Sequence, residues 1–82
     1  MKSNIVYREL RQLLLDLGFR ERKEANAIAF DHESSDVRFV FRRYRLDEPV
    51  TGYNLLDVRL MLDSRDLMSA SAFEDQFKKT PA

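Results

Sequence analysis

The stretch from Asn26 to Arg45, NAIAFDHESSDVRFVFRRYR, decides the fold. It contains two alternating apolar runs, residues 26–31 and 37–44, which are separated by the polar segment DHESSD. Runs of this kind on either side of a short polar segment predict two antiparallel strands joined by a turn. The centre of the chain is therefore expected to be a β-hairpin.

The two faces of this hairpin are expected to differ in polarity, because side chains alternate along a strand. One face collects the apolar residues Ile28, Phe30, Val37, Phe39 and Phe41. The opposite face collects Ala27, Ala29, Arg38, Val40, Arg42 and Tyr44. A sheet with one apolar and one mixed face needs covering on one side only, which is typical of antiparallel sheets.

A helix is predicted before the hairpin. Its stripe recurs at helical spacing and consists of Val6, Leu10, Leu13, Leu14 and Leu17. Ser3 is the expected N-cap, and Gly18 is expected to end the helix, with Phe19 folding back onto Leu14. The segment FRERK, residues 19–23, predicts a further short strand beside the hairpin.

Two more helices are predicted after the hairpin. Residues 46–52 contain a proline and a glycine and read as a loop, which leads into a helix over about 53–64. Ser69 is the expected cap of a short final helix, in which Met68 would pack against Phe73, and residues 78–82 are expected to be a frayed tail. The chain 1–82 therefore predicts one α+β domain, a two-layer sandwich of α-β-β-β-α order with a short C-terminal helix. Its three-stranded antiparallel sheet would carry the helices on one face.

Composition excludes several classes of function. The 82 residues include no cysteine and one histidine, so no disulfide, thiolate or ordinary zinc site is expected, and no cofactor is predicted. The acidic turn DHESSD does not have the spacing of an EF-hand loop. Basic and acidic residues balance at zero net charge, so binding to nucleic acid would require charge segregated onto one face. The charged N-terminus and the short apolar runs indicate no membrane segment, and a cytoplasmic location is expected.

Several short motifs in this order resemble the HicA (YcfA-like) mRNA interferase toxins. They are ELRQLLLDLGF at 9–19, ANAIAF at 25–30, LLDVRLML at 55–62 and DLMSASAF at 66–73. The resemblance covers about residues 5 to 77. It implies a fold akin to the double-stranded-RNA-binding domain, and it implies RNA or an antitoxin-like protein as partner.

The resemblance also implies a missing catalytic group. The histidine of the family aligns with Ala27, and alanine exchanges no proton, so no catalytic residue is assigned and the domain is expected to bind rather than cleave. His32 does not replace it, because it falls in the predicted turn beyond the strand and is expected to be exposed. The alternatives are an active ribonuclease toxin that uses another residue, and an interaction module with no role in nucleic-acid binding.

Two surfaces are candidates for binding. If FRERK pairs beside the hairpin, a basic strip lies on the open sheet face, and arginines near an aromatic ring suit phosphate contacts and base stacking. This strip consists of Arg20, Arg22, Arg38, Arg42 and Tyr44. The alternative is an ordinary solvated face in which arginine stems cover small residues.

The second candidate is an apolar stripe on the helix at 53–64, formed by Leu56, Leu60 and Met61. Left uncovered, this stripe would bind a protein partner or a second copy of the chain as a weak homodimer; otherwise the protein would be a monomer. The alternative is that the final helix, with Phe73 and Phe77, buries the stripe.

Overall fold

The computed structural model describes residues 5–77, and within them the predicted α+β order is confirmed. Ser3 and the tail at 78–82 lie outside the described residues. The elements are α1 (Tyr7–Asp16), β1 (Arg20–Lys23), β2 (Ala27–His32), β3 (Val37–Arg42), α2 (Gly52–Ser64) and α3 (Ala70–Phe77).

The three strands form one antiparallel sheet in the order β1-β2-β3. In the centre of the sheet, Ala29 pairs with Arg22 on one side and with Val40 on the other. The strand predicted over 37–44 is shorter than expected, because β3 ends at Arg42. Residues 43 and 44 therefore lie outside the strand.

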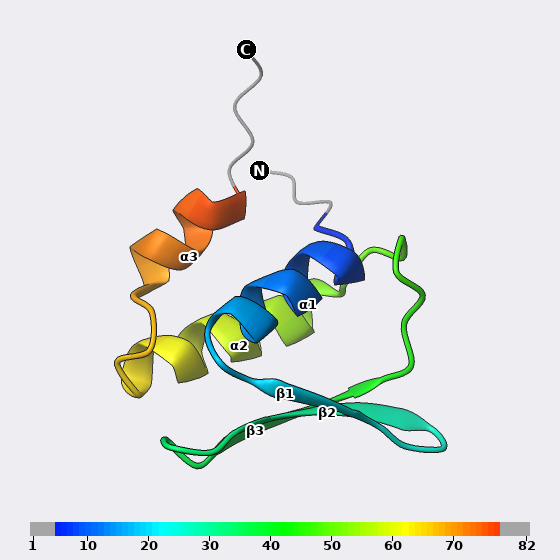
Figure 1. Cartoon of the computed structure of the whole chain (residues 1–82). Coiled ribbons are helices and arrows are strands. Elements are labelled where there is room, and N and C mark those ends of the chain that lie inside the picture. The colour runs from blue at the N-terminus through cyan, green and yellow to red at the C-terminus, as the bar shows by residue number, and fades with distance from the viewer. Residues whose placement is uncertain (1–4, 78–82) are drawn as a thin grey trace.

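The helices leave one face of the sheet open (Figure 1). α1 and α2 lie side by side over the sheet, and α3 packs against α2 on the side away from the strands. The alternation of buried and exposed residues along β3 agrees with this arrangement, since every second side chain faces the helices.

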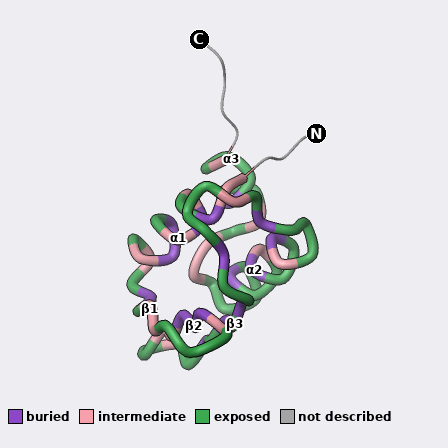
Figure 2. The backbone as a smooth tube through the Cα atoms, turned by 90° about the vertical axis from the view of Figure 1, so that its right-hand side faces the viewer, coloured by how far each residue is buried: buried purple, intermediate pink, exposed green. Residues whose placement is uncertain are grey.

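A single apolar core fills the space between the helices and the sheet. Figure 2 shows the buried parts of the chain turned toward this space. No polar or charged residue among the described ones is buried. The core consists of Tyr7, Leu10, Leu13, Leu14, Phe19, Ile28, Phe30, Val37, Phe39, Phe41, Tyr44, Val50, Leu55, Val58, Leu62 and Phe73.

The C-terminal end of α1 is closed as predicted. Gly18 has a φ of +99°, the left-handed conformation that favours glycine. Its amide donates to Leu15 O at 3.0 Å, and the amide of Phe19 donates to Leu14 O at 2.9 Å. These two bonds form the Schellman motif, which satisfies carbonyls at the end of the helix and turns Phe19 into the core.

The N-terminal end of α1 differs from the prediction. Its N-cap is Val6, which has no side-chain acceptor, and the Glu9 carboxylate instead accepts from the Val6 amide at 3.2 Å. The predicted cap, Ser3, lies outside the described residues. Only half of a capping box is therefore made at this end.

The segment predicted as a plain loop, residues 46–52, is tied to the start of the chain. The amide of Tyr7 donates to Glu48 O at 2.8 Å, and the amide of Val50 donates to Ile5 O at 2.8 Å. Val6 and Pro49 form an antiparallel bridge between them. The backbone around the first turn of α1 is thus satisfied by residues some forty positions away.

Within the described part of the chain, none of the helices combines the length and the apolar character that crossing a membrane requires.

Candidate functional site

The four predicted arginines lie on the open face of the sheet. Arg20 and Arg22 come from β1, and Arg38 and Arg42 come from β3, so they stand on the two outer strands. Arg20, Arg38 and Arg42 are exposed and Arg22 is half-buried. Alternation along the strands was therefore sufficient to bring these cations onto one face.

An acidic residue that was not predicted on this face lies between these arginines. Asp31 of β2 is opposite Arg20 on one side and Arg38 on the other. Its carboxylate forms ion pairs with Arg38 Nε at 2.9 Å and with Arg22 Nη2 at 3.4 Å. Alternation from Ala27 already puts Asp31 on this face, so the signal was present in the sequence. Asp31 divides and partly neutralises the basic strip.

Arg42 is also paired. Its Nη2 contacts the Glu48 carboxylate at 2.9 Å, and its guanidinium lies over the Tyr44 ring, 4.1 Å from the centroid. The amide of Arg45 and the Arg42 guanidinium hold the pKa of Glu48 below its usual value. Of the four arginines, only Arg20 has no ion pair within residues 5–77.

Tyr44 does not belong to the open face, which corrects the prediction for this residue. It is only 7% exposed and stacks on Tyr7 at a centroid distance of 5.6 Å. Its hydroxyl accepts from Asn54 Nδ2 at 2.8 Å and from the Thr51 amide at 3.3 Å. Burial alone would raise the pKa of this hydroxyl, but the hydrogen bonds from Thr51 and Asn54 outweigh burial and lower it. Because β3 ends at Arg42, strand alternation no longer determines the direction of residue 44.

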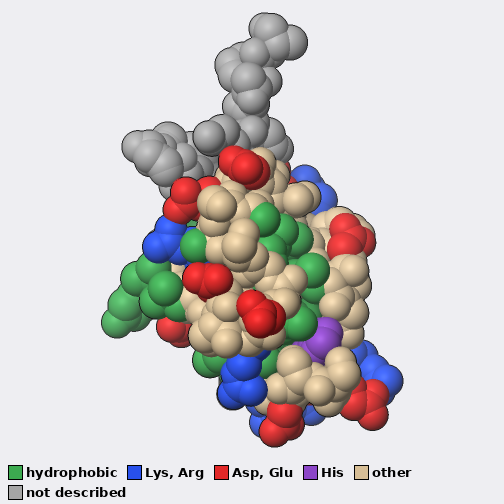
Figure 3. Space-filling view, turned by 90° about the vertical axis from the view of Figure 1, so that its left-hand side faces the viewer, with side chains coloured by type: hydrophobic (Ala, Val, Ile, Leu, Met, Phe, Trp, Pro, Cys, Tyr) green, Lys and Arg blue, Asp and Glu red, His purple; other side chains and the backbone are tan. Residues whose placement is uncertain are grey.

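The prediction for His32 is also wrong in its setting. His32 is the last residue of β2 and is half-buried, not an exposed turn residue. Its Nε2 lies 3.1 Å from Leu17 O, and its Nδ1 lies 2.8 Å from Ser35 Oγ. A carbonyl only accepts, so Nε2 carries the proton of the hydrogen bond to Leu17 O. The ring packs on Phe19 at 4.8 Å, and Figure 3 shows it (purple) set among other side chains.

These contacts give His32 a structural role, because it joins the end of α1 to the β2–β3 turn. Ala27 faces the open side of the sheet in register with Arg42. Among residues 5–77, no group of three or more side chains is arranged to hold a metal ion.

The apolar stripe on α2 is exposed. Leu56 is 47% exposed, Leu60 is 53% exposed and Met61 is 37% exposed. Tyr53, which the sequence analysis did not include, extends this stripe by one turn and is 78% exposed. Figure 3 shows hydrophobic side chains projecting at the edge of the molecule where α2 lies.

α3 does not cover the stripe because it meets a different side of α2. Its Phe73 enters the core, and its Glu74 forms an ion pair with Arg59 of α2. Leu56 and Leu60 are consequently left facing solvent.

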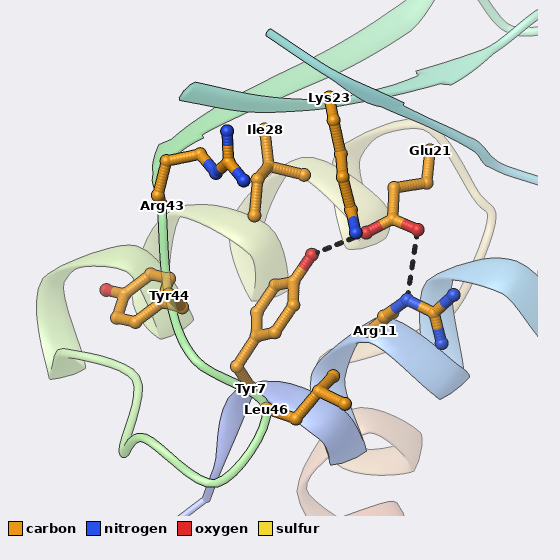
Figure 4. A pocket seen from close by; sticks show the side chains of 8 residues that line it. All are labelled: Tyr7, Arg11, Glu21, Lys23, Ile28, Arg43, Tyr44 and Leu46. Atoms are coloured by element: carbon orange, nitrogen blue, oxygen red, sulfur yellow. Dashed lines mark hydrogen bonds and ion pairs between the residues drawn. The ribbon is translucent and has the colours of Figure 1, made fainter. Parts of the chain in front are cut away.

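A small pocket opens between the start of α1 and the sheet (Figure 4). It has a volume of about 150 Å³. Inside it, the Glu21 carboxylate accepts from the Tyr7 hydroxyl at 3.0 Å and from Arg11 Nε at 3.0 Å. Burial is the main cause that raises the pKa of Tyr7. The hydrogen bond that Tyr7 makes with Glu21 and the negative charge of Glu21 raise it further. The lining residues are Tyr7, Arg11, Glu21, Lys23, Ile28, Arg43, Tyr44 and Leu46.

Comparison of the chain with protein-family models, with curated proteins and with solved structures returned no significant match.

Proposed function

We propose that this domain is a non-catalytic binding module, and that the exposed side of α2 binds a basic amphipathic helix of another protein. The observation that carries this proposal is the uncovered stripe of Tyr53, Leu56 and Leu60. These residues are spaced i, i+3 and i+7, the spacing by which one helical face makes apolar contact with a partner. An antitoxin-like chain, as the sequence resemblance implies, would be a partner of this kind.

The charges beside the stripe favour a basic partner. Successive residues are about 100° apart around a helix, which puts Asp57 between Met61 and the row formed by Tyr53, Leu56 and Leu60, and puts Asp63 on the other side of that row. Both residues are exposed, and neither forms an ion pair within residues 5–77. Lysine or arginine on a partner helix would meet these carboxylates, and complementary charge of this kind guides association and fixes orientation.

A second copy of the chain fits this surface less well. Two α2 helices facing each other would bring their acidic flanks together, and like charges across an interface oppose association. The expected state of the free chain is therefore a monomer.

A titration with a designed helical peptide tests this proposal. The probe is a fluorescently labelled leucine–lysine amphipathic peptide, and its control is the same peptide with glutamate in place of lysine. We expect saturable binding of the lysine peptide only, and we expect Leu60→Asp to weaken it at least about tenfold, because a charge would be buried in the contact.

Val40→Asp is the matched control variant, since Val40 is 59% exposed but lies on the open sheet face. It should bind the peptide as the native chain does. Equal loss of binding in both variants, or equal binding of the two peptides, would contradict the proposal. Sedimentation of the chain alone tests whether a second copy of the chain occupies this surface. Self-association that Leu60→Asp abolishes would show that it does, and would overturn the proposal of a basic partner helix.

RNA binding by the open sheet face is the second candidate. It is supported by the presence of Arg20, Arg22, Arg38 and Arg42 on a single face, with Arg20 free of ion pairs within the described residues. It is weakened by Asp31 and by the absence of an aromatic residue from this face, now that Tyr44 lies in the core.

Filter binding to structured and single-stranded RNA tests this candidate. Binding by arginine–phosphate contacts should fall steeply with salt and weaken in the double variant Arg38→Glu/Arg42→Glu. Asp31→Asn should strengthen it, since it removes the carboxylate that occupies two of the arginines. No binding at low salt in any of these chains would eliminate the candidate.

The alternative of an active ribonuclease is tested by expressing the chain in growing cells. A non-catalytic domain should leave growth and total RNA unchanged. Growth arrest with RNA cleavage that survives His32→Ala would show that another residue supplies the chemistry.

A further inference from the structure

The pocket beside α1 combines apolar walls with an excess of positive charge (Figure 4). The rings and chains of Tyr7, Ile28, Tyr44 and Leu46 form its apolar part. Its polar part contains three cations and one anion, namely Arg11, Lys23, Arg43 and Glu21.

The single anion in the lining, Glu21, already has hydrogen-bond donors on both of its oxygens. One Glu21 oxygen accepts from Tyr7 and the other accepts from Arg11, both at 3.0 Å, and the carboxylate is mostly shielded from solvent. The charges of Glu21 and Arg11 therefore cancel within the pocket. The remaining charge is that of Lys23 and Arg43.

Neither of these two cations is neutralised within residues 5–77. Lys23 is exposed and forms no ion pair there. Arg43 Nη1 donates to the backbone carbonyls of Glu24 at 2.9 Å and Ala25 at 3.4 Å, which hold its guanidinium in place but leave its charge uncompensated. A fixed arginine and a free lysine at one pocket are suited to a carboxylate or a phosphate.

The volume limits the size of the ligand. A cavity of about 150 Å³ accommodates one benzene ring. Pockets that hold larger metabolites or drugs are about 300–1,000 Å³, so a whole nucleotide does not fit. We infer that the pocket between α1 and β1 binds a small organic anion with a single ring, the ring lying against the apolar walls and the carboxylate or phosphate meeting Lys23 and Arg43.

Titration of the isotope-labelled chain, followed by amide chemical shifts, tests this inference. The probes are benzoate and phenyl phosphate. Each should bind saturably with a dissociation constant on the order of 1 mM, as is usual for a ligand of this size. The amides that shift should be those of β1 and of the segment at 43–46. Benzyl alcohol, which lacks the charge, and inorganic phosphate, which lacks the ring, should each bind about tenfold more weakly.

Two exposed cations of the same strand provide matched variants. Lys23→Ala should weaken benzoate binding about fivefold to tenfold, since it removes one of the two charges, whereas Arg20→Ala should leave it unchanged because Arg20 is not part of the pocket lining. Both positions are exposed, so neither variant disturbs the core. Absence of saturable shifts, shifts that lie elsewhere, or equal effects of the two substitutions would overturn the inference. None of these outcomes depends on the exposed side of α2.

Discussion

At the scale of the residue, Gly18 shows how one backbone conformation supports a whole helix end. Its φ of +99° is unfavourable for any residue with a β-carbon, although an added β-carbon would meet the nearest atom, His32 Nε2, at an ordinary 3.5 Å. Gly18→Ala should therefore lower the free energy of unfolding by about 1–2 kcal/mol through backbone strain rather than through a clash. Urea denaturation followed by circular dichroism measures this difference.

Gly52→Ala is the matched control for that experiment. Gly52 is the first residue of α2, it does not have a left-handed φ, and a β-carbon there would have no neighbour within 4 Å. Its substitution should change the free energy of unfolding by no more than about 0.5 kcal/mol. Equal stability of the Gly18 variant and the native chain would mean that the proposed helix-end geometry is wrong.

At the scale of the element, α2 depends on the residue that precedes it. Thr51 is its N-cap, and the Thr51 hydroxyl accepts from the Asn54 amide at 3.3 Å. Thr51→Ala should lower the free energy of unfolding by about 1 kcal/mol, because it leaves that amide without its acceptor. Thr51→Ser retains the hydroxyl and should restore most of the loss in the same urea titration. A serine variant as unstable as the alanine variant would show that the methyl group, not the cap, is responsible.

The elements also show which features could be read from the sequence. The strands, the helix end at Gly18 and the Ser69 cap depend on neighbours in sequence, and the structure has all of them. Tyr44 could not be placed, because its direction is set by contacts with Tyr7 and Asn54 rather than by the strand before it. The contact between His32 and Leu17 spans 15 residues and is likewise invisible to local pattern.

The candidate surfaces also have some features that follow from local sequence and others that depend on contacts between distant residues. Alternation was sufficient to put the four arginines on one face, but the ion pairs that Arg22 and Arg38 form with Asp31 depend on the register of β2 against both of its neighbours. The apolar stripe of Leu56, Leu60 and Met61 on α2 was visible in the sequence. Whether it is covered depends on where α3 docks, and that is decided by Phe73 and the Arg59–Glu74 contact.

At the scale of the whole molecule, the stacked residues Tyr7 and Tyr44 should change the free energy of unfolding in opposite directions as pH becomes alkaline. The pKa of Tyr7 is raised in the folded state, so above the ordinary tyrosine pKa of about 10 the unfolded chain loses this proton first. The free energy of unfolding should consequently fall as pH rises past that value. Tyr7→Phe should remove this contribution, and at neutral pH it should cost about 1 kcal/mol because Glu21 loses a donor.

Tyr44→Phe should act in the opposite sense. The pKa of Tyr44 is lowered, so the folded chain releases this proton first and gains stability as pH rises toward the value of the unfolded chain. The gain in stability as pH rises toward about 10 should therefore be absent from this variant, while the decline above that value, which Tyr7 causes, should remain. Urea titrations over a series of alkaline pH values measure both slopes. Identical slopes in all three chains would show that neither hydroxyl is held as described.

The bridge between Val6 and Pro49 has a consequence for the order in which the molecule assembles. The amides of Tyr7 and Arg8 find their acceptors at Glu48 and Leu46, so the first helix cannot complete its N-terminal hydrogen bonding until the chain has been synthesised past both strands of the hairpin. During synthesis, the start of α1 therefore lacks these acceptors until residues 46–48 have been added to the chain. Contacts so distant in sequence slow folding relative to a purely local helical protein of similar size. They also couple the start of α1 to the segment at 46–50, so neither end of this contact forms without the other.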